Sequence, residues 1–273
     1  MIQVEERYIS LLTDFGFKRI FGTAINKDLL ICFLNSLFDG KQVVKDVSYL
    51  NPEHVGDVYT DRKAIFDVYC EGENGEKFIV EMQNAYQTYF KDRSLFYSTF
   101  PIREQAALLN FDMNEEAFEK EKIRHSVQLC DTATHKVFYD KLEFIYVEIA
   151  KFNKSLEELE TLYDKWLYAL KNLYKLTQRP KELCDKVFDR LFEEAEIAKF
   201  TPQELREYEA SKIAYRDIKN SVDTAKREGI AEGMEKKSLE IAKKMLTKGM
   251  DEATVMEITG LSAELIQQLK AEM

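Results

Sequence analysis

Residues 65–83, IFDVYCEGENGEKFIVEMQ, constrain the fold of this chain more than any other segment. Two short runs rich in β-branched and aromatic residues flank Glu73-Asn74-Gly75, and this arrangement is typical of a β-hairpin. Because side chains along a strand alternate between the two faces of a sheet, the length of the turn decides which residues share a face.

Two turn lengths are compatible with this hairpin. A two-residue turn at Asn74-Gly75 would place Asp67 opposite Met82 and would direct Glu81 to the other face. A three-residue loop, with Gly75 in the left-handed conformation, would place Asp67 opposite Glu81. The longer loop makes one face wholly apolar: Phe66, Val68, Cys70, Phe78, Val80 and Met82. The hydrophobic pattern therefore predicts this register. The other face then carries Asp67, Tyr69, Lys77, Ile79, Glu81 and Gln83.

The predicted register brings two carboxylates together. Directly opposed acids repel by up to about 1 kcal/mol on a sheet surface, so Asp67 and Glu81 need compensation. A divalent cation is one source, because Mg²⁺ is commonly bound by one or two carboxylates together with phosphate and water. Gln83, on the same face, could orient a water molecule or a phosphate oxygen. Acids are also ordinary on the solvated face of a hairpin, so a simple structural role stays open on this pattern alone.

Two helices are predicted before the hairpin. The first covers residues 13–22, with Thr13 or Asp14 as its N-cap and Gly22 at its end. The second starts at Asn26, carries one apolar stripe and ends near Gly40.

The remaining pattern predicts strands in the first half of the chain and helices in the second. Residues 43–50 are predicted as a strand and the stretch up to Lys63 as a loop. Residues 91–109 have a helical pattern that Pro101 should interrupt, and residues 124–152 have β character with a turn at 131–134. Beyond Ser155 the pattern is almost wholly helical.

Composition narrows the class of protein. The 273 residues are 45% hydrophobic and carry a net charge of -10, as expected of a soluble acidic protein with a sizeable core. No apolar run has the length of a membrane span, and no export signal is visible, so a cytoplasmic location is expected. Net acidity argues against coating nucleic acid with a broad basic face, although local contact with DNA stays open. The 4 cysteines have no spacing typical of a zinc site or a disulfide framework.

Several motifs in a fixed order resemble those of the PD-(D/E)XK nuclease superfamily, and within it the Rpn family of recombination-promoting nucleases and transposases. The resemblance covers about the first two thirds of the chain. It rests on DFGFKRIFG at 14–22, LLICFLNSLF at 29–38, FDVYCEGENGEKFIVEMQ at 66–83, RSLFYSTFPIREQ at 93–105, FIYVEIAKFNK at 144–154 and DKWLYALKN at 164–172.

This resemblance implies an α/β (α+β) fold with an α-β-β-β-α-β core. It also implies that Asp67 and Glu81 bind a divalent cation, Mg²⁺, and that Gln83 stands where many members have lysine. A neutral amide cannot supply the charge of an ammonium, so the metal would carry more of the activation of water. Three further residues are implied as second-shell or DNA-contact groups: Asp14, Lys18 and Arg93. Asp14 could equally be a helix N-cap, and Lys18 and Arg93 could equally be solvated helix residues.

The chain departs from the family pattern after Gln105, where REQAALLNFDMNEE passes directly into an acidic stretch. Residues 84–106 are long enough for a parallel crossover, so ALLNF could form a short last strand of the core. We expect stunted pairing there, which could leave the nuclease weak or inactive.

The C-terminal stretch MDEATVMEITGLSAELIQQL predicts two short helices around Thr259-Gly260-Leu261, a spacing similar to that of a helix-turn-helix. Its acidic side chains favour packing or self-association over reading DNA. The expected domains are a nuclease-like domain at 1–152, a helical region at 153–215 and a charged helix with the helix-turn-helix-like segment at 216–273.

The sequence thus predicts a metal-dependent DNA endonuclease linked to recombination, with DNA as partner, no membrane association and a homo-oligomer formed through the C-terminal helices. The alternative is a catalytically impaired, truncated relative that acts as a DNA- or protein-binding module.

Overall fold

The computed structural model describes residues 6–50, 53–54, 64–65, 67–84, 95, 105–111, 113 and 118–271. The chain forms two compact units, Met1–Ile218 and Lys219–Met273. The domain boundaries expected at 152/153 and 215/216 stay a prediction.

The first unit begins with the two predicted helices. Helix α1 (Asp14–Phe21) starts after Thr13, the N-cap, and ends at Gly22. Helix α2 (Lys27–Phe38) follows the short 3-10 turn η1 (Ala24–Asn26) and ends in a left-handed Asp39. Their buried faces are the apolar stripes that the spacing predicted.

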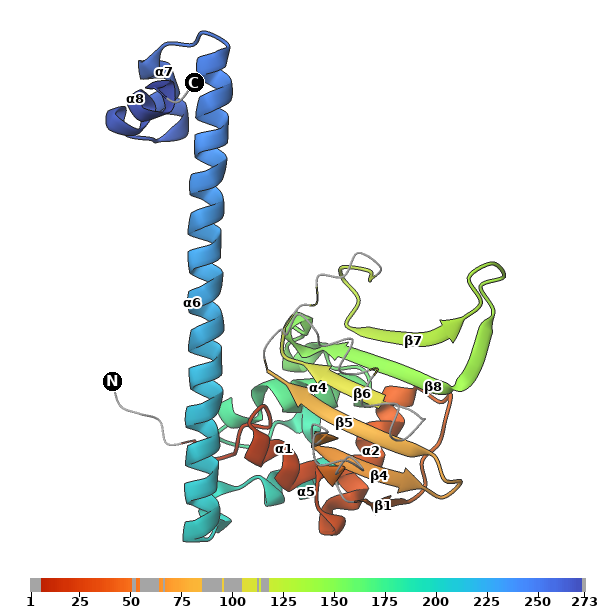
Figure 1. Ribbon diagram of the computed structural model, residues 1–273. Coiled ribbons are helices and arrows are strands. Elements are labelled where there is room, and N and C mark those ends of the chain that lie inside the picture. The colour runs from red at the N-terminus through yellow and green to blue at the C-terminus, as the bar shows by residue number, and fades with distance from the viewer. Residues whose placement is uncertain are drawn as a thin grey trace. The chain divides into compact units, whose positions relative to one another are not determined.

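A six-stranded sheet carries the rest of the first unit's core, in the order β1-β4-β5-β6-β8-β7 (Figure 1). The strands are β1 (Val47–Tyr49), β4 (Val68–Gly72), β5 (Lys77–Gln83), β6 (Gln105–Leu109), β7 (Arg124–Cys130) and β8 (Val137–Glu148). Strand β1 is shorter than the predicted 43–50. The expected loop before Lys63 contains β2 (Glu53–His54), which pairs with β3 (Ala64–Ile65).

The hairpin of β4 and β5 has the predicted three-residue loop. Pairing of Val68 with Val80 and of Glu71 with Lys77 defines the register, and the backbone N–H of Gly72 donates to the carbonyl of Glu76 at 2.8 Å. Gly75 has a φ of 79°, a conformation that glycine adopts without strain. Continued by one residue, this register sets Asp67 opposite Glu81. Phe66 lies outside the described residues.

The expected stunting of the strand after Gln105 is wrong. Strand β6 forms parallel ladders with β5 on one edge and with β8 on the other, and Leu108 and Leu109 are fully buried. Residues 105–109 are therefore strand rather than the end of a helix. The downstream strand β8 covers the edge that would otherwise have been open. The helix predicted from residue 91 and its break at Pro101 fall almost entirely outside the described residues.

The β character of residues 124–152 is confirmed by the antiparallel hairpin of β7 and β8. The pairing shifts register between Gln128 and Cys130. Of the twelve residues of β8, only the last five, from Phe144 to Glu148, also pair with β6.

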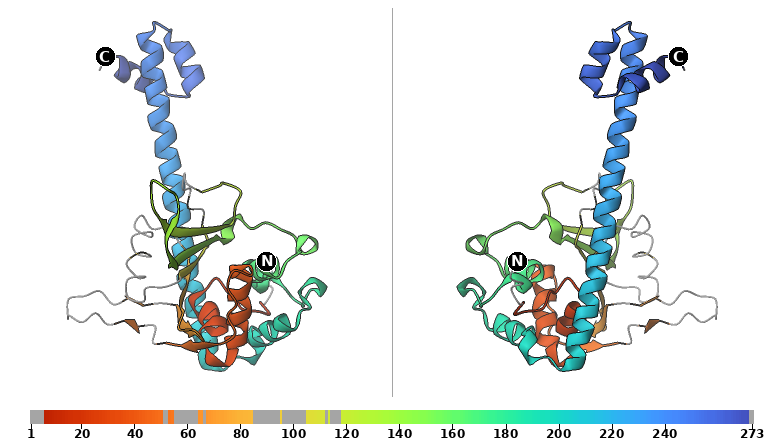
Figure 2. Two further views of the ribbon diagram at one scale, coloured as in Figure 1. Left: turned by 90° about the vertical axis from the view of Figure 1, so that its right-hand side faces the viewer. Right: turned by 90° about the vertical axis from the view of Figure 1, so that its left-hand side faces the viewer.

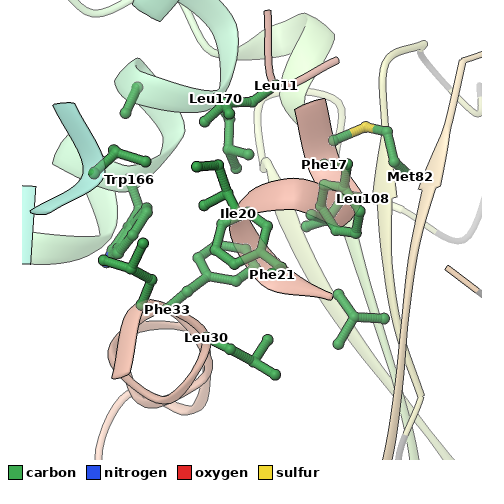
Figure 3. Packing of buried hydrophobic residues seen from close by; sticks show 14 of the residues in the cluster. Leu11, Phe17, Ile20, Phe21, Leu30, Phe33, Met82, Leu108, Trp166 and Leu170 are labelled. Carbon is green, nitrogen blue, oxygen red and sulfur yellow. The ribbon is translucent and has the colours of Figure 1, made fainter. Parts of the chain in front are cut away.

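Helices α1, α2, α4 (Leu162–Asn172) and α5 (Lys186–Glu194) gather on one side of the sheet (Figure 2). Figure 3 shows α1 in the middle of this packing, with Phe17 toward Met82 and Leu108 of the sheet and Phe21 toward Phe33 and Trp166. Trp166 is completely buried. The connecting 3-10 turns are η2 (Ile149–Lys151), η3 (Leu156–Glu158), η4 (Leu173–Lys175), η5 (Lys181–Leu183) and η6 (Ile197–Lys199).

Helix α6 (Pro202–Thr247) continues from the first unit into the second. In the second unit its last turns pack against α7 (Glu252–Thr259) and α8 (Ala263–Ala271) around Ala242, Val255 and Ile266. Gly260, with a φ of 70°, ends α7, so the predicted helix-turn-helix spacing is confirmed.

In the described part of the chain, no single helix is long and apolar enough to cross a membrane. Only α1 and the run Ala24–Phe38 together, bent by 63° at their junction, have that length and composition.

Candidate active site

The predicted acid pair lies at one end of the sheet, on the face opposite the helices. Asp67 directly precedes β4, and Glu81 lies in β5. Their face also carries Tyr69 and Ile79, which form a small cluster of their own, while the alternate residues of both strands belong to the main core. Glu81 is only 6% exposed. Opposed residues of an antiparallel pair have Cβ atoms roughly 5 Å apart, so both carboxylates can reach one ligand.

Asp67 is held at the point where β4 starts. Its Oδ2 accepts the backbone N–H of Met82 at 2.8 Å, so the side chain extends the pairing of the two strands by one step. Burial raises the pKa of the Asp67 carboxyl above its ordinary value and outweighs the opposite effects of the Met82 N–H and the Lys18 ammonium. A partly dehydrated carboxylate of this kind gains stability from a cation.

Two further predicted residues, Asp14 and Lys18, come to the same place from α1. The Lys18 Nζ lies 2.7 Å from Asp14 Oδ1 and 3.7 Å from Asp67 Oδ1. Burial alone would lower the pKa of Lys18, but the two carboxylates together raise it. The N-cap of α1 is Thr13, whose Oγ1 accepts the N–H of Gly16 at 3.1 Å. Asp14 is therefore the first helical residue and does not cap the helix.

The ends of β5 and β6 are tied to their surroundings. The carbonyl of Gln83 accepts the N–H of Asn110 at 2.9 Å. The side-chain amide of Asn84 donates to the carbonyl of Leu12 at 2.9 Å, which links the end of β5 to the segment before α1. These bonds fix Gln83 at the same end of the sheet as the acid pair. Arg93 lies outside the described residues.

Sequence reasoning missed a third acid on this face, Glu148 at the end of β8. Gln83 of β5 pairs with Leu109 of β6, and Leu109 pairs in turn with Glu148 of β8. Neighbouring strands lie about 4.8 Å apart, so Glu148 is two strands away from Gln83 on the same row of the sheet. Glu148 is completely buried. Its carboxylate accepts bonds from the Met113 N–H at 2.6 Å, from His125 Nε2 at 3.0 Å and from Lys151 Nζ at 2.8 Å.

The signal that could have found Glu148 was the same one that singled out Asp67 and Glu81. The run FIYVEIA contains one acid among β-branched and aromatic residues. Three donors already bind the carboxylate of Glu148. We therefore assign it to holding the segment around Met113 and not to binding a cation together with Asp67 and Glu81.

Asp67 and Glu81 suit a hard divalent cation. Across the described residues, no group of three or more His, Cys, Asp or Glu side chains converges. The chain thus offers two carboxylates, which matches the way Mg²⁺ is commonly held, with its other positions left to water and substrate phosphate. The Asp67 carboxylate is held at the start of β4 by the Met82 N–H, and Glu81 lies buried in the neighbouring strand, so the donor set fits such an ion.

The second unit has a balanced surface. Its helix-turn-helix segment, from residue 235 to 271, contains as many basic as acidic side chains. The bases are Lys236, Lys237, Lys243, Lys244, Lys248 and Lys270, and the acids are Glu235, Glu240, Asp251, Glu252, Glu257 and Glu264.

Comparison with protein families gives two matches. Residues 235–271 match the C-terminal helix-turn-helix domain of the Rpn/YhgA-like nuclease family. A helix-turn-helix domain in a nuclease family indicates binding to DNA. Neither the curated proteins nor the solved structures provide a match. Residues 11–225 match the PD-(D/E)XK nuclease family transposases, whose superfamily generally uses divalent metal ions. That match spans α1, the acid pair and the whole six-stranded sheet, and the chain therefore belongs to the PD-(D/E)XK nuclease family transposases.

Proposed function

We propose that this protein is a metal-dependent DNA endonuclease of the Rpn, transposase-like type, linked to DNA recombination. Asp67 and Glu81 hold Mg²⁺, and Gln83 positions the attacking water. The observation that carries the proposal is the hairpin register, which sets the two acids opposite each other at the end of β4 and β5. Family membership supports a nuclease, and the terminal helix-turn-helix domain supports DNA as substrate.

The reaction is hydrolysis of a phosphodiester. The oxygen of a water molecule attacks phosphorus in line with the leaving sugar oxygen, a new P–O bond forms and the ester P–O bond breaks. The water releases a proton to solvent and the leaving oxygen takes one up, so the balance needs only water. A bound Mg²⁺ would lower the pKa of the attacking water and neutralise charge on the phosphate.

The side chains of the chain supply position and charge for this step. The Gln83 amide can donate to or accept from the attacking water, since it has both kinds of group. Asp14, Lys18 and Arg93 either contact the DNA or hold the residues that bind the cation. Lys18 and Asp14 are the two of these that lie beside Asp67 in the described residues.

The alternative of an impaired, truncated relative was motivated by the shortened segment after Gln105. Strand β6 is paired along both edges and Leu108 is fully buried, so the core at this point supports a working sheet. This observation favours the enzyme over the binding module.

Cleavage of plasmid DNA in the presence of Mg²⁺ tests the proposal. We expect the wild-type protein to convert supercoiled plasmid to nicked and linear forms, and both Asp67→Ala and Glu81→Ala to reduce that rate by at least about 1,000-fold. Addition of EDTA should have the same effect as the substitutions.

A matched control is Asp46→Ala, because Asp46 is an exposed acid that pairs with Lys27 at 2.7 Å, away from the acid pair. It should cut at the wild-type rate. Equal cutting by wild type and Asp67→Ala would mean that a contaminant or another site is responsible, and absence of cutting in all variants would leave the protein as a binding module.

We also propose a cytoplasmic location and a homo-oligomer formed through the C-terminal helices. Sedimentation velocity on the full chain and on a chain that ends at residue 218 tests the second point. A single monomeric species for both would exclude self-association through these helices.

A further inference from the structure

Hydrolysis of a phosphodiester adds negative charge to a place that already holds two carboxylates. Gln83 is neutral, and Glu81 is almost fully buried, so the described acid pair needs positive charge beyond a single divalent ion. The structure provides a cation from outside the hairpin. It is Lys18 of α1, whose Nζ lies 3.7 Å from Asp67 Oδ1 at the end of the sheet.

The two contacts of Lys18 differ in strength. Its ammonium makes a short ion pair with Asp14, at 2.7 Å, and a longer one with Asp67, at 3.7 Å. The side chain of Asp14 is 64% exposed and that of Asp67 is 24% exposed, so Lys18 pairs more tightly with the more exposed of its two partners. An ammonium has three N–H donors, and two carboxylates leave at least one of them for a ligand oxygen.

Helix α1 is held rigidly enough to place this ammonium. A Cβ at Gly16 would clash with the carbonyl oxygen of Ser10, so the start of the helix lies directly against the preceding segment. Phe17, one residue before Lys18, is completely buried. The bond from Asn84 to the Leu12 carbonyl then ties that segment to the end of β5. The position of Lys18 is therefore coupled to the strand that carries Glu81 and Gln83.

Lys18 is also open to a substrate. It is 41% exposed, and together with Asp14 and Arg19 it lines a surface groove between α1 and the first turns of α6, which Glu204 and Glu207 also line. Its exposure, and its distance of 3.7 Å from Asp67 Oδ1, leave the ammonium within reach of a phosphate oxygen bound next to Asp67.

We propose that Lys18 is a catalytic residue: its ammonium donates to the scissile phosphate and stabilises the charge that develops there during attack by water. Asp14 is a positioning residue that holds the ammonium when Asp67 engages a cation. Lys18 stays protonated throughout, so no proton is transferred through it. This inference rests on the proposed nuclease function and assigns one step of it to a residue of α1.

Lys18→Met and Lys18→Arg, compared with Lys27→Met, test the assignment in the full chain. Lys27 is a good control because it is similarly exposed, at 46%, and pairs with an aspartate at the same 2.7 Å. Loss of a donor to a developing charge commonly lowers kcat by about 100- to 1,000-fold, and we expect that loss for Lys18→Met with little change in KM for DNA. Lys18→Arg should keep part of the rate, and Lys27→Met should keep all of it.

A second measurement separates catalysis from a structural ion pair. Removal of a positive charge next to Asp67 should tighten Mn²⁺ binding several-fold, measured by calorimetry without DNA, while kcat falls. A merely structural Lys18 would weaken Mn²⁺ binding or leave it unchanged, since its loss would disturb the acid pair. Asp14→Asn should lower kcat by about tenfold, less than the loss of Lys18 itself.

The last experiment asks whether a lysine placed elsewhere in the site can replace Lys18. In the double variant Lys18→Met, Gln83→Lys, the new lysine projects from the same sheet face as Glu81, and we expect at least tenfold recovery of kcat over Lys18→Met. A Lys18→Met enzyme that cuts at the wild-type rate, or one whose loss lies wholly in KM, would overturn the assignment. If wild type binds Mn²⁺ but does not cut, the nuclease proposal fails, and the inference that rests on it fails with it; if wild type cuts and Lys18→Met cuts equally well, only the inference fails. If wild type neither cuts nor binds Mn²⁺, both fail.

Discussion

The two faces of the β4–β5 hairpin are built from alternate residues of the same strands, but they do different work. On the helix-covered face, Val68, Cys70, Phe78 and Val80 are buried in the main core with α1, α2 and α4. On the other face, Tyr69 and Ile79 form a small cluster, and the strand ends carry Asp67 and Glu81. Packing on the helix-covered face fixes the register, and this register places the two acids together on the other face.

This difference teaches that the stability and the chemistry of the hairpin are separable. A change in the register should disturb both faces at once, a change in one core side chain should mainly affect stability, and a change in an acid should mainly affect chemistry. Four predictions test this separation, from the largest expected effect to the smallest.

Deletion of Lys77 from β5 should have the largest effect. With the three-residue loop kept, it would place Phe78, Val80 and Met82 opposite Glu71, Tyr69 and Asp67, so neither face of the hairpin would stay wholly apolar. We expect a loss of more than about 4 kcal/mol in the free energy of unfolding, or no folded protein at all. Urea unfolding followed by circular dichroism measures it.

Lys77→Ala is the control for this deletion, because it keeps the register and should change stability by no more than about 0.5 kcal/mol. A deletion variant that unfolds within about 1 kcal/mol of wild type would show that the hairpin register is not set by its apolar face.

Alternation along residues 65–83 was sufficient to predict this register, and with it the shared face of Asp67, Glu81 and Gln83. That prediction succeeded because a hairpin is local and because only one register makes a wholly apolar face. The helices α1 and α2 and the hairpin of β7 and β8 were predictable for the same reason, from local periodicity and turn residues.

The parts that sequence could not give are set by contacts between distant segments. Strand β6 is stable because β8, from beyond residue 136, covers its second edge. The approach of Lys18 to Asp67 depends on the packing of α1 against the sheet, which no periodicity reveals. Glu148 is similar, since its three donors come from Met113, His125 and Lys151.

Leu108→Ala and Leu109→Ala sharpen the comparison of the two faces with one residue type. Both side chains are completely buried in β6, but Leu108 packs into the large core with the helices and Leu109 into the smaller cluster with Phe144 and Tyr146. Leucine-to-alanine changes in cores cost about 2–5 kcal/mol, more where the surroundings cannot collapse. We expect Leu108→Ala near the upper end and Leu109→Ala near the lower end, measured by urea unfolding. A larger loss for Leu109→Ala would reverse the assignment of the main core to the helix-covered face.

Glu204→Gln tests how α1 is held on that face. Glu204 accepts the Thr201 N–H at 2.7 Å and forms an ion pair with Arg19 of α1. The Thr201 N–H and hydroxyl, and then Arg19, lower the pKa of Glu204 to about 2. Because this folded-state pKa lies below the unfolded value, the stabilisation is present above about pH 4.5 and is lost as the pH falls toward 2.

We therefore expect Glu204→Gln to lose about 1 kcal/mol near pH 7, less than about half of that near pH 3 and almost nothing near pH 2, by urea unfolding at each pH. Glu207→Gln, a neighbouring change on an exposed side chain that accepts a bond from Gln203, should show no such pH dependence. A pH-independent loss for Glu204→Gln would mean that the carboxylate charge does not hold α1.

Asp67→Asn should have the smallest effect on stability, and with the opposite sign. Burial raises the pKa of Asp67 in the folded protein, so the ionised carboxylate destabilises the fold in the absence of a cation. Because the pKa of Asp67 is higher in the folded protein than in the unfolded chain, wild type becomes more stable as the pH falls and Asp67 takes up a proton, and less stable as the pH rises. In EDTA near neutral pH we expect Asp67→Asn to be more stable than wild type by no more than about 1 kcal/mol, and we expect this difference to disappear at acidic pH.

Asp46→Asn should behave in the opposite way, because Lys27 lowers the pKa of Asp46 and the charge of this carboxylate is stabilising. Excess Mn²⁺ should raise the melting temperature of wild type and leave that of Asp67→Asn unchanged, since binding to the native state alone stabilises it. A less stable Asp67→Asn in EDTA would mean that the carboxylate is there to hold the strand end; a more stable one would mean that the fold keeps this acid for the cation, against its own stability.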